Sequence, residues 1–194
     1  MTRRPLTAAQ TVGPFFHPTM LRDDVPQHTL AAPGTVGQRV RVEGRVLDGA
    51  GAPAPDAVIE LWQANSHGRY NHPADTRDLP LDPAFLGFAR AGTDDEGRYW
   101  FDTVRPGRVP FPDGRLQAPH LCLTVFARGL LHHLLTRVYF DDDAANADDP
   151  ILLLVPSKRR ATLIARSEGS ATVFQHDIIL QGDSETVFLN PVAT

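Results

Sequence analysis

The sequence holds one cysteine, Cys122, among its 194 residues, and this scarcity limits the chemistry open to the chain. A disulfide within the chain needs two cysteines and a multi-cysteine zinc cage needs more, so both are excluded. No apolar run approaches the roughly 18 residues that a membrane span needs. The first residues include two arginines but no apolar stretch behind them, which is unlike a secretory signal. We therefore expect a cytoplasmic protein without a membrane partner.

Several common motifs of catalysis and binding are also missing. The chain has no glycine-rich phosphate loop, no Gly-x-Ser-x-Gly nucleophile turn and no His-Glu-x-x-His metal motif. The acidic runs 141–143 and 148–149 match no cation-loop spacing, and we interpret them as solvated turns. A net charge of −4 argues against general nucleic-acid binding, so we interpret the short basic run 158–160 in the same way.

What the chain does contain favours a β-protein. Apolar residues make up 42% and charged residues 22%, which excludes a wholly disordered chain or a coiled coil. Proline, which breaks helices and central strands, accounts for 17 residues against a usual share of about 5%. Residues 39–46 alternate charged and apolar side chains, as a half-buried strand does. Further strands are predicted at 58–62, 98–101, 120–128, 136–140 and 173–181, and together they favour an antiparallel β-sandwich.

Two regions are less regular than these strands. Residues 1–35 show no sustained period, which predicts an N-terminal arm lying on a surface, ahead of a sandwich domain at 36–194. Phe15 and Phe16 follow a rigid Gly-Pro corner in this arm, and exposed aromatics lower solubility, so we expect the segment to pack against something. Within 151–166, Ile151–Val155 fits a buried strand, while Ala161–Arg166 fits either a strand or a helix.

The longest predicted strand, 120–128, has two distinct faces. Because side chains alternate along a strand, Leu121, Leu123 and Val125 share one face. The opposite face carries His120, Cys122, Thr124, Phe126 and Arg128. The histidine pair that follows at 132–133 would point to opposite faces of a strand and cannot chelate one ion together. Isolated histidines elsewhere, His176 among them, are interpreted as hydrogen-bonded structure.

Several segments together resemble the intradiol dioxygenases, which are ferric enzymes that split aromatic diols between the two hydroxyl carbons with molecular oxygen. These segments are Gly44–Asp48, Glu60–Asn65, Gly68–Tyr70, Leu81–Phe85 and Thr93–Tyr99. The resemblance implies a prealbumin-like sandwich and a site where two tyrosinates and two histidines hold Fe(III). Phenolate oxygens suit a hard, highly charged ion, and imidazoles complete the set.

The matching ligand positions are occupied by other residues in this chain. The tyrosine positions fall on Arg77 and Val109, and the paired histidines fall on His120 and Cys122, with Gln117 where the iron-bearing chain has an arginine. A guanidinium stays protonated and cannot donate a lone pair, and valine has no donor atom. None of the three tyrosines, Tyr70, Tyr99 and Tyr139, falls on a ligand position. The resemblance therefore predicts that this chain binds no iron at these vestigial positions.

Within the family, the resemblance is to a metal-free alpha subunit whose beta subunit holds the Fe(III). It implies that the arm crosses to that partner, so that Thr11, Gly13 and Pro14 line the pocket for an aromatic diol and O2. Arg128 matches a residue beside that pocket and would complement the carboxylate of an aromatic acid. The structural alternatives are a simple turn at Gly13-Pro14 and a surface ion pair at Arg128.

Two other functions remain open from the sequence. Some of the same segments resemble prealbumin-like accessory domains, which are non-catalytic β-sandwich binding or scaffolding modules that usually lack the arm. A self-sufficient enzyme using another ion through His120 and Cys122 would need ligands beyond these two, and the sequence supplies none that we can locate.

Overall fold

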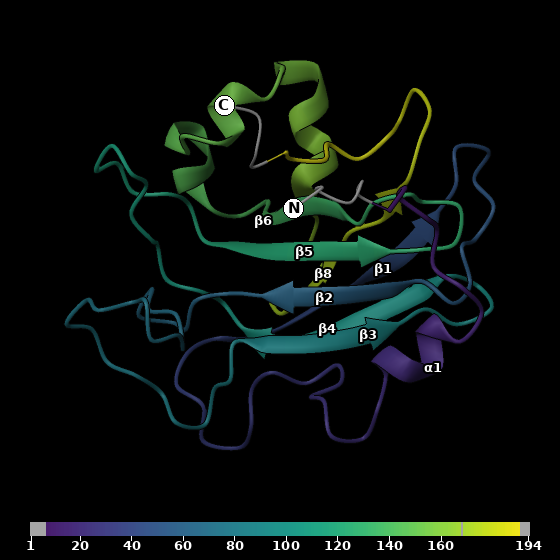
Figure 1. The fold of residues 1–194 in the computed structure, drawn as a ribbon. Coiled ribbons are helices and arrows are strands. Elements are labelled where there is room, and N and C mark those ends of the chain that lie inside the picture. Colours follow the sequence, from purple (N-terminus) through teal and green to yellow (C-terminus); the bar gives the residue numbers. More distant parts are fainter. Residues whose placement is uncertain (1–6, 168, 191–194) are drawn as a thin grey trace, which may run out of the picture.

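The computed structural model describes residues 7–167 and 169–190, which form two β-sheets packed face to face (Figure 1). One sheet contains β4 (Arg98–Val104), β1 (Arg39–Leu47) and β8 (Val173–Gln175) in that order, and β9 (Ile178–Ile179) also pairs with β1. The other has the order β3 (Phe88–Gly92), β2 (Val58–Trp62), β5 (His120–Phe126), β6 (Leu134–Phe140) and β7 (Ile164–Ala165). The predicted all-β sandwich is confirmed.

The alternation of the sequence sets which side chains enter the core. On β1, Val40, Val42 and Val46 are buried, while the charged residues between them face outward. On β5, Leu121, Leu123 and Val125 enter the same core, as their shared face predicts. The long strands pair antiparallel, but the short strands β7, β8 and β9 pair parallel to their neighbours.

Helical structure is limited to short pieces in the described ranges, and none is long and apolar enough to cross a membrane. They are α1 (Phe16–Met20) and three 3₁₀ segments, η1 (Ala144–Asp148), η2 (Leu152–Leu154) and η3 (Ser157–Leu163). The prediction of a buried strand at Ile151–Val155 is wrong, because Leu152–Leu154 form η2 instead. The predicted strand 173–181 is interrupted at His176 and Asp177, which separate β8 from β9.

A segment of the predicted arm closes the open side of the sandwich. Strands β3 and β4 are edge strands of their two sheets. The His28 amide donates to the Arg90 carbonyl on β3, and the Leu30 amide donates to the Asp102 carbonyl on β4. Arg90 and Asp102 in turn donate to the carbonyls of Pro26 and His28. Residues 26–30 therefore supply hydrogen-bond partners to backbone groups of both edge strands. Packing of the arm on a partner subunit stays a prediction.

Candidate functional site

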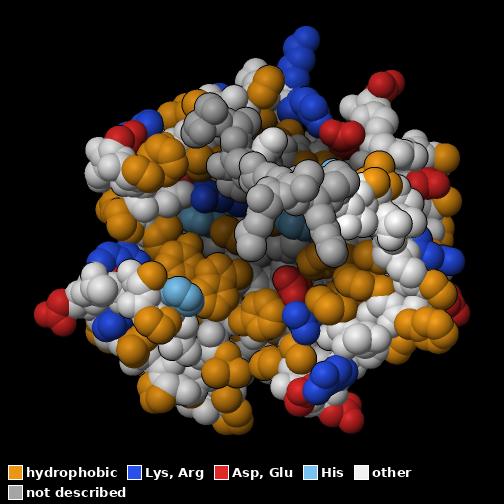
Figure 2. Space-filling model, viewed as in Figure 1, with side chains coloured by type: hydrophobic (Ala, Val, Ile, Leu, Met, Phe, Trp, Pro, Cys, Tyr) orange, Lys and Arg blue, Asp and Glu red, His pale blue; other side chains and the backbone are white. Residues whose placement is uncertain are grey.

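The residues predicted to matter for function lie at two ends of strand β5. His120 and Cys122 stand at its beginning, and Arg128 lies beyond its end. At roughly 3.4 Å per residue, these eight residues separate the two groups by about 25 Å. We call the first group the pocket end and the second the arm end. Both lie on the outer face of the β3-β2-β5-β6 sheet, where hydrophobic side chains gather around a small group of charged ones (Figure 2).

The pocket end contains a cavity of about 660 Å³ that we call the degenerate pocket. Its wall includes Arg77, Val109 and Gln117, three positions that the resemblance to the iron-bearing chains singles out. Trp62 and Tyr70 stack with ring centroids 5.7 Å apart and form a flat aromatic side of the cavity. Residues distant in the sequence thus meet around one space large enough for a single-ring molecule.

Arg77 is held in an ion pair inside the degenerate pocket. Its Nε and Nη2 donate to the two carboxylate oxygens of Asp75 at 2.8 and 2.6 Å, and Nη2 also donates to the Gly68 carbonyl at 2.7 Å. The hydrogen bonds from Arg77, and a further one from the Tyr70 amide, hold the pKa of Asp75 well below its usual range. The guanidinium is therefore fixed by its own carboxylate.

A second cation, Arg137 on β6, was missed by the sequence reasoning. Antiparallel pairing places it opposite Cys122, and its Nη1 donates to Gln117 Oε1 at 2.7 Å and to Tyr139 Oη at 3.3 Å. The Tyr139 hydroxyl donates in turn to the buried Asp149 at 3.1 Å. The predicted strand 136–140 includes Arg137, but only the strand register shows that it lies behind the pocket wall.

Burial favours the neutral forms of three ionisable groups at the pocket end, His120, Cys122 and Tyr70. His120 Nδ1 lies 2.8 Å from the Ala118 carbonyl, while its buried Nε2 has no hydrogen-bond partner. Burial, assisted by the Arg137 charge, lowers the pKa of His120 to about 4. Burial also raises the pKa of the Cys122 thiol and raises the pKa of Tyr70 to about 12.

These residues do not fit a ferric ion. Arg77 is a cation bound to Asp75, and Val109 is buried and offers no donor. Only the imidazole of His120 and a protonated thiol at Cys122 remain, and no three His, Cys, Asp or Glu side chains form a metal-binding group in residues 7–167 and 169–190. Hard Fe(III) prefers anionic oxygen ligands, which this set lacks.

The side chains at the arm end are more exposed than those at the pocket end, and fewer hydrogen bonds hold them. Thr11 Oγ1 accepts a hydrogen bond from the Gly129 amide at 2.7 Å, which brings the arm beside Arg128. Arg128 forms an ion pair with Asp56 at 2.8 Å, and its side chain is 60% exposed. This is the surface ion pair that the sequence left as an alternative.

The Gly13-Pro14 corner leads from Thr11 into α1. The Phe16 amide donates to the Gly13 carbonyl at 3.1 Å, and no atom lies within 4 Å of the place where a Gly13 Cβ would stand. Of the two aromatics expected to pack, Phe16 lies 5.3 Å from the Phe126 ring, whereas Phe15 is 79% exposed. The arm thus presents an aromatic side chain and an open backbone to the surroundings.

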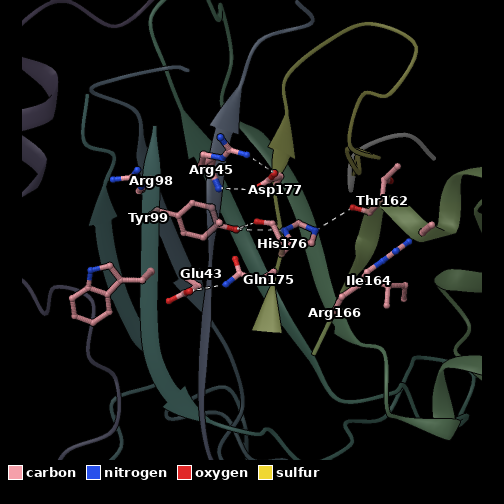
Figure 3. A pocket seen from close by; sticks show the side chains of 13 residues that line it. Glu43, Arg45, Arg98, Tyr99, Thr162, Ile164, Arg166, Gln175, His176 and Asp177 are labelled. Atoms are coloured by element: carbon pink, nitrogen blue, oxygen red, sulfur yellow. Dashed lines mark hydrogen bonds and ion pairs between the residues drawn. The ribbon is translucent and has the colours of Figure 1, made fainter. Parts of the chain in front are cut away.

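A separate cavity of about 570 Å³ lies against the β4-β1-β8 sheet, and Figure 3 shows its lining. The Tyr99 hydroxyl donates to the His176 carbonyl at 2.8 Å, and the His176 Nε2 lies 3.1 Å from the Thr162 carbonyl. Burial lowers the pKa of His176, and Arg45 forms an ion pair with Asp177. Because the buried groups satisfy one another, we assign this cluster to holding the strands together, as expected for an isolated histidine.

Comparisons with known proteins agree with this geometry. A family model described as Dioxygenase matches residues 12–182. The chain is 43% identical to the protocatechuate 3,4-dioxygenase alpha chain of Burkholderia cepacia, over 98% of this chain and 100% of that protein. It is 37% identical to the beta chain from the same organism, over 94% and 78% of the two chains. A hydroxyquinol 1,2-dioxygenase structure from Pseudomonas putida DLL-E4 matches with a TM-score of 0.62 at 22% identity, over 91% and 68%.

The chain therefore belongs to the intradiol dioxygenase family, and it is a subunit of a dioxygenase. Its similarity to both an alpha and a beta chain places it among proteins that assemble from two related subunits.

Proposed function

We propose that this chain is the non-iron-binding alpha subunit of a cytoplasmic protocatechuate 3,4-dioxygenase. In this assignment a beta subunit holds the Fe(III), and the αβ assembly cleaves protocatechuate with O2 between its hydroxyl carbons to give 3-carboxy-cis,cis-muconate. The Fe(III) held by that subunit would supply the activation of the diol toward oxygen. This chain walls the partner's site with its arm and supports the assembly.

The observation that carries this proposal is the ion pair between Arg77 and Asp75. It stands at a position where the iron-bearing chains of the family need a tyrosinate, and it puts a permanent positive charge there. The guanidinium has no lone pair to offer Fe(III), and both oxygens of its carboxylate partner are engaged by Arg77. The chain therefore keeps the sandwich of a dioxygenase but not the means to hold the metal itself.

The arm end supplies the second part of the argument. The hydrogen bond between the Gly129 amide and Thr11 brings the arm beside Arg128, although more than a hundred residues separate Thr11 from Arg128. An exposed guanidinium is suited to the carboxylate of protocatechuate, because charge-assisted hydrogen bonds are the stronger ones. Apart from its chain neighbours, nothing lies within 4 Å of the place where a Gly13 Cβ would stand. A ligand can therefore approach the backbone closely at Gly13.

Reconstitution tests the subunit assignment. The purified chain is mixed with a beta-type chain that carries both tyrosines and both histidines, and oxygen uptake is measured with protocatechuate. We expect this chain alone to hold no stoichiometric iron and to show no visible tyrosinate band, while the mixture consumes oxygen. Stoichiometric iron with that band in the isolated chain would contradict the assignment.

Deletion of residues 1–16 separates a pocket-wall role from an inert scaffold. We expect the deletion to lower turnover per assembled αβ unit, because it removes Thr11, Gly13 and Pro14 from the partner's pocket. Deletion of residues 1–6 is the matched control, since it leaves those three positions in place. A scaffolding module would instead show the same turnover per assembled unit with either deletion.

A further inference from the structure

Helix α1 has only the five residues Phe16–Met20, which is too short a helix to be stable on its own. Isolated helices below about 12–15 residues are marginal in water. The helix therefore depends on contacts with the rest of the chain, and those contacts decide where the arm lies. The Phe16 amide donates to the Gly13 carbonyl at 3.1 Å, so the Gly13-Pro14 corner is joined to the first turn of α1.

The C-terminal end of α1 is held by Arg90 on β3. Arg90 Nη1 donates a hydrogen bond to the Met20 carbonyl at 3.3 Å. The last carbonyls of a helix have no partner within it, and a cation placed near them interacts favourably with the helix dipole. Among residues 7–167 and 169–190, Arg90 is the one charged side chain that donates a hydrogen bond to this helix.

Glu60 on β2 fixes the direction of the Arg90 guanidinium. The register of β2 and β3 places the two residues opposite each other. Both Nε and Nη2 of Arg90 contact Glu60 Oε1, at 2.8 and 2.7 Å, and the two side chains are only 20% and 21% exposed. Because a guanidinium is planar and rigid, holding two of its nitrogens also sets the third. That third nitrogen is Nη1, which contacts the Met20 carbonyl.

The backbone of Arg90 holds the chain that follows α1. The Arg90 amide donates to the Pro26 carbonyl, and the Arg90 carbonyl accepts from the His28 amide, both at 2.9 Å. Between these two attachments, Gln27 Nε2 donates to the Leu21 carbonyl at 3.2 Å. One residue of β3 therefore anchors the arm twice, with its side chain at the end of α1 and with its backbone at residues 26–28.

The remaining contacts of α1 are close but apolar in character. A Cβ at Gly92 would lie 2.4 Å from a Leu21 methyl carbon and 2.5 Å from His17 Nε2, so the helix lies directly against β3 (Figure 1). Phe16 packs on Phe126, with ring centroids 5.3 Å apart. Apolar burial is not directional, whereas a hydrogen bond has a preferred geometry. The bond from Arg90 therefore adds the orientation that packing alone does not supply.

From these contacts we infer that Arg90, directed by Glu60, is a positioning residue for the arm. It holds the C-terminal end of α1 against β3, and through α1 it sets the place of the Gly13-Pro14 corner. The expected effect on turnover rests on the proposed function, in which that corner lines the partner's pocket. The effect on the arm itself does not, since every contact involved lies within this chain.

Hydrogen exchange of the full chain tests whether Arg90 holds the arm. The double variant Arg90→Met with Glu60→Gln removes the guanidinium and leaves no charge unpaired. We expect the Leu21 and Gly129 amides to exchange at least threefold faster, while amides within β1 exchange as in the parent, which excludes general destabilisation. Arg90→Lys keeps a cationic donor and should restore most of the protection. Unchanged exchange at both amides in the double variant would overturn the inference.

Turnover in the reconstituted complex tests the consequence for the partner. We expect the double variant to lower kcat/KM for protocatechuate at least threefold per assembled αβ unit. Arg41→Met with Asp102→Asn is the matched control and should act as the parent does, because it removes a cross-strand pair of the same kind that does not bond to α1.

The deletion of residues 1–16 separates the two ways in which this test can fail. If that deletion lowers turnover but the double variant does not, although its arm amides exchange faster, the positioning role of Arg90 is overturned. If the deletion itself leaves turnover unchanged, the pocket-wall role of the proposed function fails. The exchange rates of Leu21 and Gly129 then decide by themselves whether Arg90 positions the arm.

Discussion

The two ends of strand β5 differ in how their functional side chains are held. At the pocket end, His120 and Asp149 are both buried, and the Asp149 carboxylate accepts hydrogen bonds from three backbone amides and the Tyr139 hydroxyl. At the arm end, Thr11 is held by one hydrogen bond and Arg128 by one exposed ion pair. A closed end of this kind is suited to structure or to a small ligand, whereas an open end is suited to another protein chain.

The difference also bears on the proposal that this chain keeps the fold of the family without holding a metal. At Arg77, one of the proposed vestigial positions, the side chain is held by an ion pair with Asp75 within the chain. This ion pair leaves no unpaired charge at that position. The surface that we propose to serve the partner lies about 25 Å away along β5, so it is separate from this ion pair.

From the comparison of the two ends of β5, we expect the Asp149→Ala substitution at the pocket end to cause the largest loss of stability. This change leaves three backbone amides and the Tyr139 hydroxyl without their acceptor. We expect unfolding in urea to show a loss of about 4 kcal/mol. Asp113→Ala, which removes an exposed carboxylate paired with Arg115, should be indistinguishable from the parent. Equal stability of the two variants would show that the pocket end is not tightly held.

The pH dependence of stability should come from the pocket end as well. His120 has a pKa of about 4 in the folded protein and about 6.5 when unfolded. Between these values the unfolded chain binds more protons, so stability falls as the pH is lowered from about 6.5 to 4, by about 3 kcal/mol. Buried His176 acts in the same direction. Urea midpoints measured against pH should give a shallower slope for His120→Phe, and parallel slopes would contradict this assignment.

At the arm end we expect an effect on turnover and not on stability. In the reconstituted complex, Arg128→Gln should lower kcat/KM for protocatechuate about tenfold, which is about 1.4 kcal/mol. A diol without a carboxylate should be turned over as before, because Arg128 is proposed to contact that group. Melting of the chain should be unaltered, since exposed ion pairs contribute little. Arg45→Gln, on the other sheet, serves as the control, and equal losses for both diols would refute the carboxylate contact.

The smallest expected effect is that of Thr11→Val, which removes the hydrogen bond between the arm and Gly129. Because this hydrogen bond is exposed, the free energy of unfolding should fall by less than about 1 kcal/mol. Hydrogen exchange of the Gly129 amide should be faster in the variant, and Thr11→Ser should restore the parent rate. An unchanged rate would show that the arm is not attached here in solution.

The sequence predicted the parts of the fold that depend on alternation. Val40 and Val42 on β1, and Leu121 and Leu123 on β5, face the core as their spacing requires. Strand β3 was missed, because Ala89 and Ala91 lack the β-branched or aromatic character that marks a strand. These small residues are buried, which became apparent only from the packing of β3 beside β2.

The rest of the site depends on strand register, which composition does not reveal. Arg137 is an ordinary charged residue within an alternating strand until the β5-β6 register places it opposite Cys122. The run Ile151–Val155 lies between two prolines, Pro150 and Pro156, and its apolar character was mistaken for a strand. Proline restricts its neighbours and deprives a strand of donors, so the run forms a 3₁₀ turn instead.

The seam closed by residues 26–30 has a consequence for synthesis. These residues leave the ribosome early, but their hydrogen-bonding partners Arg90 and Asp102 emerge on the order of 60–70 residues later. At about 5–20 residues per second, the early segment waits for several seconds. Residues 26–30 therefore lack these hydrogen-bonding partners until both edge strands have been synthesised, and the early segment of the chain then bridges two strands made after it.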